Sequence, residues 1–138
     1  VDAKRIELEI VESAIIENFQ SASNILNTLR ETGFSVAIDD FGTGYSSLAY
    51  LDKLPVDKLK IDREFTGKLG ADDQGGVVKS VIDLAANFGL RVIAEGVETP
   101  EQEMHLQRLG CARAQGYYYS KPIPVSQFDK TFLQLSRV

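Results

Sequence analysis

The chain has 138 residues, of which 43% are hydrophobic and 25% charged, as is ordinary for one soluble globular domain. The formal net charge of -5 argues against a surface for polymeric nucleic acid, because such surfaces need clustered Lys and Arg. The sequence contains neither a signal-peptide pattern nor the apolar run of about 18 residues that a membrane segment requires.

A single cysteine, Cys111, and a single histidine, His105, limit the metal chemistry. Zinc sites draw on several thiolates and imidazoles, so a zinc centre is not expected. A metal in this chain has to be held by oxygen atoms, which favours magnesium, manganese or calcium. The absence of a disulfide framework favours a cytoplasmic location.

Hydrophobic patterning predicts strands and helices in alternation. Near the start, Ile6, Leu8 and Ile10 alternate with acidic residues, which is typical of a strand. The expected strands cover residues 5–11, 34–39, 56–62 and 90–95, followed by a short extended piece at 112–118. The expected helices end near Gly33, run from the capping residues Ser46–Ser47 to just before Pro55, and cover residues 77–88, 99–109 and 125–135.

This order of elements predicts a parallel α/β fold of the (β/α) TIM-barrel type. A complete barrel has eight strands in about 250 residues, whereas this chain supplies about five parallel strands with alternating helices. Either the sheet is open or the chain is part of a longer barrel.

Polar residues recur at the carboxyl ends of the expected strands. Side chains alternate along a strand, so the apolar positions of each strand assign these residues to the opposite face of the sheet. They are Glu9, Asp39, Lys60, Asp62 and Glu95. Burying several carboxylates together without cations is very costly. The pattern therefore predicts a bound metal, with Lys60 and Arg91 nearby.

Regular alternation along the strand would point Asp40, which follows Asp39 directly, toward the helices. A bend at the glycine-rich turn of Gly42 and Gly44 would bring both Asp39 and Asp40 into the site. Two metals bridged by one aspartate would then be possible, as in phosphoryl-transfer enzymes that use two metals.

Of two other readings of these residues, the first fails and the second is less favoured. Asp40, Phe41 and Gly42 match the Asp-Phe-Gly motif with which protein kinases bind a metal. The kinase catalytic loop and the kinase strand lysine are absent, so this reading fails. Lys60 at a strand end could form a Schiff base, yet its acidic neighbours keep it charged and favour an electrostatic role. An unrelated metal-dependent lyase with a barrel fold remains an alternative function.

Five segments resemble, in order, the signatures of the EAL domain family, the bacterial cyclic di-GMP phosphodiesterases built on a modified TIM barrel. The segments cover residues 8–13, 39–46, 59–62, 94–98 and 115–117. The resemblance implies metal-dependent hydrolysis of cyclic di-GMP to linear pGpG in bacterial signalling. It also implies Mg²⁺ or Mn²⁺ in a two-metal site, a homodimer or other self-association, and upstream sensory or GGDEF domains in the parent protein.

The resemblance also implies a role for individual residues. The matched metal ligands are Glu9, Asp39, Asp40 and Glu95. Glu95 and Lys60 match the catalytic pair beside the attacking water and the phosphate. The matched supporting residues are Glu12, which steadies the loop after the paired aspartates, and Glu98 and Gln115, which are further polar residues of the site.

The resemblance is incomplete, because the motif that names the family and an asparagine ligand are missing. On this basis residues 1–138 are expected to be the C-terminal part of an EAL domain whose N-terminal strands are absent. Such a chain is expected to be inactive alone. The alternative is a non-catalytic EAL-like module that binds cyclic di-GMP or a protein partner.

Overall fold

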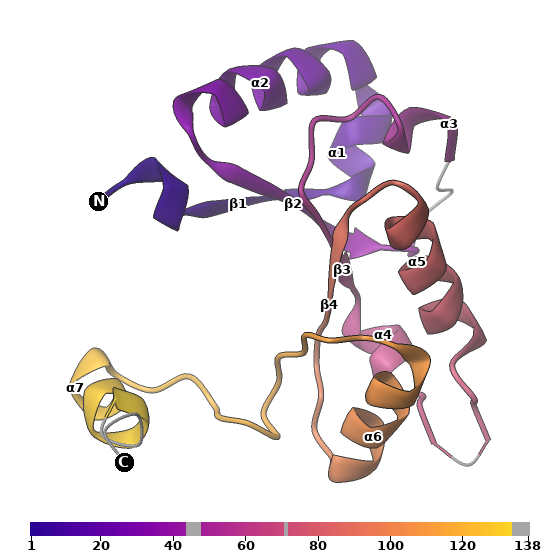
Figure 1. Cartoon of the computed structure of the whole chain (residues 1–138), viewed down its shortest axis with the longest axis vertical. Helices are drawn as coiled ribbons and strands as arrows, with labels where there is room; N and C mark the ends of the chain where they lie inside the picture. The colour runs from indigo at the N-terminus through magenta and orange to yellow at the C-terminus, as the bar shows by residue number, and fades with distance from the viewer. Residues whose placement is uncertain (44–47, 71, 134–138) are drawn as a thin grey trace.

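The computed structural model describes residues 1–43, 48–70 and 72–133, in which one parallel sheet has the strand order β1-β2-β3-β4 (Figure 1). The strands are β1 (Glu7–Val11), β2 (Ser35–Phe41), β3 (Lys58–Ile61) and β4 (Arg91–Ala94). All three neighbouring pairs are parallel, as the alternation of strands and helices predicted.

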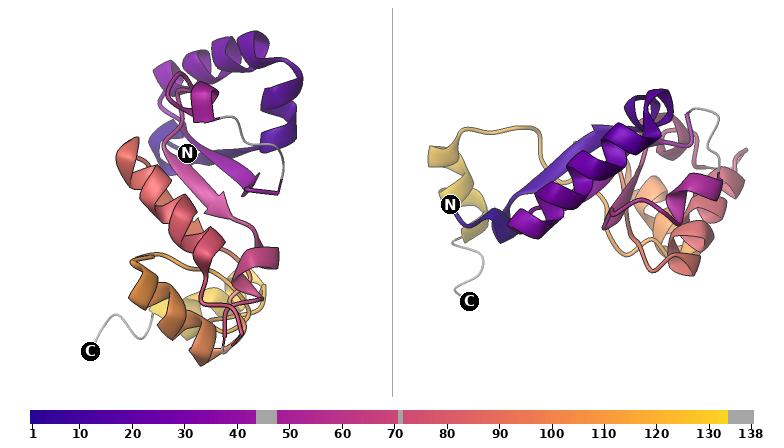
Figure 2. Two further views of the ribbon diagram at one scale, coloured as in Figure 1. Left: turned by 90° about the vertical axis from the view of Figure 1, so that its right-hand side faces the viewer. Right: turned by 90° about the horizontal axis from the view of Figure 1, so that it is seen from above.

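Helices follow the strands along the chain. They are η1 (Ala3–Arg5), α1 (Glu12–Glu17), α2 (Phe19–Thr32), α3 (Leu48–Leu51), α4 (Arg63–Thr66), α5 (Gly76–Asn87), α6 (Pro100–Leu109), α7 (Val125–Phe128) and η2 (Asp129–Leu133). Figures 1 and 2 show α7 at the end of an extended segment, apart from the helices that cover the sheet. No helix in the described part of the chain is long and apolar enough to cross a membrane.

The hydrophobic core lies between the sheet and these helices. Val36 and Ile38 of β2 and Leu59 and Ile61 of β3 are fully buried, as strand alternation predicted. They belong to one cluster with apolar residues of α1, α2 and α5. The opposite face of the sheet carries Glu9, Asp39 and Lys60, beside the apolar Ala37 and Ile93.

Capping residues define several helix ends. The backbone N–H groups of Gly33 and Gly110 bond to the last turns of α2 and α6, each glycine in the left-handed conformation. Thr99 and Gln102 form a capping box at the start of α6, where Pro100 was expected as the first residue. The sequence did not reveal α4, which begins where the Asp62 carboxylate accepts the Glu64 N–H.

The expected extended piece at residues 112–118 does not form a fifth strand. It contributes one isolated parallel bridge, from Ala114 to Ala94 of β4. The chain then turns at Gly116, where a Cβ atom would lie 2.1 Å from the carbonyl oxygen of Val97. The about five expected strands are therefore four strands and a bridge.

The expected helix start at Ser46–Ser47 lies outside the described residues, as do the last residues of the helix expected at 125–135. Within the described part, that helix is the short α7 followed by the wider turn of η2.

Candidate functional site

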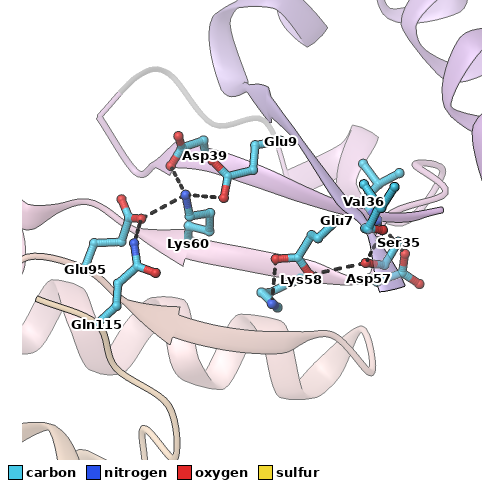
Figure 3. A network of polar contacts seen from close by, with 11 residues as sticks. Glu7, Glu9, Ser35, Val36, Asp39, Asp57, Lys58, Lys60, Glu95 and Gln115 are labelled. Carbon is cyan, nitrogen blue, oxygen red and sulfur yellow. Dashed lines mark hydrogen bonds and ion pairs between the residues drawn. The ribbon is translucent and has the colours of Figure 1, made fainter. Parts of the chain in front are cut away.

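Lys60 of β3 lies at the centre of an acidic cluster on the polar face of the sheet (Figure 3). Its Nζ atom is 2.6 Å from Glu9 Oε1, 3.2 Å from Asp39 Oδ1 and 2.8 Å from Glu95 Oε1. The Lys60 side chain is only 6% exposed. Glu9 comes from β1, Asp39 from β2, and Glu95 follows β4 directly, so strand alternation brings these four residues together as expected.

Asp40 reaches the same site through an irregularity in β2. Its φ of 54° is in the left-handed region, and the pairing of β2 with β3 shifts register between Ile38 and Phe41. The bend therefore lies at Asp40 itself, before the glycine-rich turn where it was expected. One carboxylate oxygen from each of Asp39, Asp40 and Glu95 lies within 4.8 Å of the other two.

The negative charge of the carboxylates in the site exceeds the positive charge of Lys60. Three carboxylates against the one Lys60 ammonium leave two formal negative charges, and Asp40 adds a third. Burial raises the pKa of Glu95 against the opposing effect of Lys60. Burial also raises the pKa of Asp40, together with a hydrogen bond to Asp62 and the charge of Asp39.

The Lys60 ammonium stays charged in this setting. Burial alone would lower the pKa of Lys60, but hydrogen bonds to Glu9 and Glu95 and the nearby negative charge raise the pKa above its ordinary value. A neutral amine, which a Schiff base would need, is therefore disfavoured at neutral pH.

Two of the expected supporting residues contact the cluster or the loop beside it. The Gln115 side-chain amide donates to Glu95 Oε1 at 2.5 Å. Glu12 is 3% exposed, and its carboxylate accepts hydrogen bonds from the Gly42 N–H at 3.2 Å and the Tyr50 hydroxyl at 2.8 Å. Glu12 therefore holds the turn that follows the paired aspartates.

Asp62 lies beside the cluster, and the sequence interpretation placed it on the polar face without giving it a metal-binding or catalytic role. Besides burial, the nearby Asp62 carboxylate raises the pKa of Asp40, and Asp62 also accepts the Glu64 N–H at the start of α4 at 2.7 Å. Strand alternation did place Asp62 on the polar face, two residues after Lys60. Its second task as a helix cap is what a reading of strands alone could not reveal.

A hollow of about 720 Å³ adjoins the acidic cluster. One part of its wall is polar and includes Asp40, Asp62, Glu95, Glu98 and Gln115. The remaining wall combines the cations Arg63 and Lys121 with aromatic and apolar residues of the extended segment and of α7 and η2. Glu98 thus faces the same hollow as the cluster.

The expectation that Arg91 lies near the carboxylates is wrong. Arg91 begins β4 and pairs with Lys58, two positions before the level of Lys60. It lines a separate hollow with Ile82 and Arg113. Parity assigned Arg91 to the polar face but carried no information on its height along the strand.

The donor atoms of the cluster fit a hard divalent cation. Magnesium and manganese prefer carboxylate oxygens, and the surplus negative charge of this site would be offset by such an ion. Asp39, Asp40 and Glu95 bring three such oxygens within reach of one another, and Glu9 lies beside them on the same lysine.

Comparison with known proteins finds the family that the sequence motifs resemble, along most of the chain. The family model of the EAL domain matches residues 1–122. Cyclic di-GMP phosphodiesterase NbdA of Pseudomonas aeruginosa is 44% identical over 133 residues, which are 96% of this chain and 17% of that protein.

Solved structures agree in fold and sequence. The complex of the PaMucR phosphodiesterase with c-di-GMP superposes with a TM-score of 0.87 at 40% identity, covering 93% of this chain and 52% of that chain. A manganese and cy-diGMP complex of BlrP1 from Klebsiella pneumoniae has a TM-score of 0.79 at 35% identity, covering 88% of this chain and 31% of that chain. This chain therefore spans about half, or less, of the proteins it resembles.

Proposed function

The chain belongs to the EAL domain family, and on this premise we propose that it supplies much of the active site of a phosphodiesterase that hydrolyses cyclic di-GMP to linear pGpG. The observation that carries the proposal is the cluster of Glu9, Asp39, Asp40 and Glu95 around Lys60. The name of NbdA and the c-di-GMP complex of PaMucR support it.

Each cluster residue has a role in the proposed reaction. Glu9, Asp39, Asp40 and Glu95 would hold Mg²⁺ or Mn²⁺ in a two-metal site. A bound divalent cation supplies Lewis-acid chemistry, because it acidifies water and neutralises charge on the phosphate. The manganese in the BlrP1 complex supports this choice of metal.

Lys60 and Glu95 form the proposed catalytic pair. The charged Lys60 ammonium stabilises negative charge that develops on the phosphate. Glu95 lies 2.8 Å from this ammonium, and its carboxylate would accept a proton from the attacking water.

The surrounding residues orient this pair and bound substrate. Gln115 holds Glu95 through its 2.5 Å hydrogen bond, and Glu12 holds the turn after Asp40. Glu98 lines the hollow in which we place part of the dinucleotide.

The proposal extends to the whole protein of which the chain forms part. A homodimer and a cytoplasmic location belong to it, as do sensory or GGDEF domains upstream. Support for further domains comes from MucR of Pseudomonas aeruginosa, which is named a bifunctional diguanylate cyclase and cyclic di-GMP phosphodiesterase; the matched region covers 19% of its length.

Turnover of cyclic di-GMP, followed by chromatography for pGpG, tests the proposal. The assay uses this chain and a chimera that adds the part of the PaMucR phosphodiesterase chain not covered by the match. We expect manganese-dependent turnover by the chimera and none by this chain alone.

The matched variants are Asp39→Asn, which should abolish turnover by the chimera, and Glu7→Gln, which alters a carboxylate two residues before Glu9 and should not. Binding of cyclic di-GMP without hydrolysis would contradict the enzymatic proposal and favour a non-catalytic module. If the folded chimera neither bound nor cleaved the dinucleotide, the choice of substrate would be wrong.

A further inference from the structure

Tyr50 lies outside the acidic cluster but is connected to it. It belongs to α3, and its ring packs against Phe19 of α2 with ring centroids 6.2 Å apart. The Tyr50 hydroxyl donates a hydrogen bond of 2.8 Å to Glu12 Oε1. The ring thus anchors a hydroxyl group that reaches a buried carboxylate.

Glu12 passes this contact on to the backbone beside the site. While Oε1 accepts from Tyr50, the second oxygen, Oε2, accepts the Gly42 N–H at 3.2 Å. Only 3% of Glu12 is exposed, and a buried carboxylate is strongly oriented by the donors that satisfy it. Loss of one donor therefore alters the position or mobility of the other contact.

The turn that contains Gly42 needs such support. Asp40 and Gly42 both have positive φ angles, 54° and 94°, and the first is unfavourable for a residue with a side chain. Thr43 holds one side of the turn, since its N–H and hydroxyl donate to the Asp40 carbonyl at 3.3 and 2.7 Å. On the other side of the turn, Glu12 holds the Gly42 N–H.

We infer that Tyr50 is a positioning residue of the metal site, which acts through Glu12 and the Gly42 amide to hold Asp40 in its strained conformation. The inference rests on the proposed function, because it assumes that Asp40 is a metal ligand. Tyr50 belongs neither to the acidic cluster nor to the wall of the hollow beside it. Its hydroxyl restricts Asp40 before a cation binds, so less conformational entropy is lost on binding.

The test compares Tyr50→Phe with the unaltered chain by calorimetric titration with Mn²⁺. The substitution removes the hydroxyl and keeps the ring against Phe19, so folding should be little affected. We expect Mn²⁺ affinity to fall roughly fivefold, the net size of one ordinary hydrogen bond and less than that of a bond to a charged group, because Tyr50 acts on Asp40 only through Glu12 and Gly42. Amide hydrogen exchange at Gly42 should become faster in the metal-free protein.

Phe19→Leu is the matched control, because it weakens the ring packing and keeps the hydroxyl. It should lower the melting temperature and reduce Mn²⁺ affinity less than Tyr50→Phe does. In the Tyr50→Phe and Glu12→Gln double variant, the losses of affinity should be less than additive, since both act through the same chain of bonds.

Three results would overturn the inference: unchanged Mn²⁺ affinity in folded Tyr50→Phe, unchanged Gly42 exchange, or additive losses in the double variant. Failure of the proposed function has a different signature. In that case the unaltered chain, folded by circular dichroism, would bind no Mn²⁺, while Gly42 exchange would still report whether Tyr50 supports the turn.

Discussion

Two polar networks lie along one face of the sheet, only two residues apart on their strands, and they differ in charge balance (Figure 3). Lys58 pairs with Glu7 at 2.7 Å, and the Ser35 hydroxyl contacts the same carboxylate at 3.4 Å. Lys60, in contrast, contacts three carboxylates. The first network is a neutral pair, and the second leaves surplus negative charge.

The difference shows how position along the strand separates structure from chemistry. Lys58 and Glu7 lie toward the amino ends of β3 and β1, where the ion pair joins β1 to β3 across the face of β2. The Lys60 cluster lies at the carboxyl ends, where barrel enzymes build their active sites. The same residue types therefore stabilise the fold at one level and favour a cation at the next.

The largest expected effect is that of Asp39→Asn. The change keeps the size of the side chain and removes one charged ligand, so Mn²⁺ affinity should fall by roughly 100-fold or more. Calorimetric titration of the metal-free protein measures it. Glu7→Gln is the control from the neutral network, and equal losses in both variants would contradict the separation of the two networks.

Lys60→Met should have the next largest effect, on stability. Removing the ammonium leaves three carboxylates facing one another, which should lower the free energy of unfolding by about 2 kcal/mol, less than for a fully buried pair because Glu9 is half exposed. Urea unfolding in EDTA measures the loss, and Mn²⁺ should restore part of it. An unchanged unfolding midpoint in EDTA would show that Lys60 does not balance the acids.

Lys58→Met should cost less, about 1 kcal/mol, because only one pair of partly exposed charges is broken. The same urea experiment applies. Mn²⁺ affinity should be unaffected, which makes this variant the matched partner of Lys60→Met. A large change in affinity would mean that the two networks are coupled.

The smallest expected effect is on pH dependence. The pKa values of Asp40 and Glu95 are raised above their ordinary values of 3.8 and 4.5, so protons compete with the metal at a higher pH than usual. Mn²⁺ affinity should fall by a few-fold between about pH 7 and about pH 5.

The stability of the metal-free protein should change in the opposite direction. An acid with a raised pKa in the folded state favours folding when protonated, so this contribution is gained as the pH falls and lost as it rises. Calorimetric titration with Mn²⁺ measures the affinity, and urea unfolding of the metal-free protein measures the stability, each at several pH values. Asp40→Asn is the control for both. A flat affinity profile across this range would contradict the pKa shifts.

Much of the site could be predicted from the sequence because strand alternation is a strict rule. It brought Glu9, Asp39, Lys60 and Glu95 to one face, and the structure agrees. The same rule pointed Asp40 the wrong way, since it does not include a residue forced into a left-handed conformation. This conformation depends on two contacts that the alternation rule does not include. Glu12, which is distant in the sequence, accepts the Gly42 N–H, and the Thr43 hydroxyl donates to the Asp40 carbonyl.

The fold could be predicted to a similar degree. Four strands and the capped helix α6 have strong local signals, and both were expected correctly. The expected fifth strand is reduced to one bridge between Ala94 and Ala114, because the extent of strand pairing depends on tertiary contacts that have no local signature. Asp62 was placed on the polar face, but its role as a helix cap was missed because α4 is too short to detect in the sequence.

The central claim is that the surplus charge around Lys60 holds divalent cations. Crystals of the protein soaked in MnCl₂, with anomalous scattering measured near the manganese edge, test it most directly. The account predicts an anomalous peak between the carboxylates of Asp39, Asp40 and Glu95, and none beside Lys58 and Glu7. Equal density at both networks, or none at the Lys60 cluster, would contradict it.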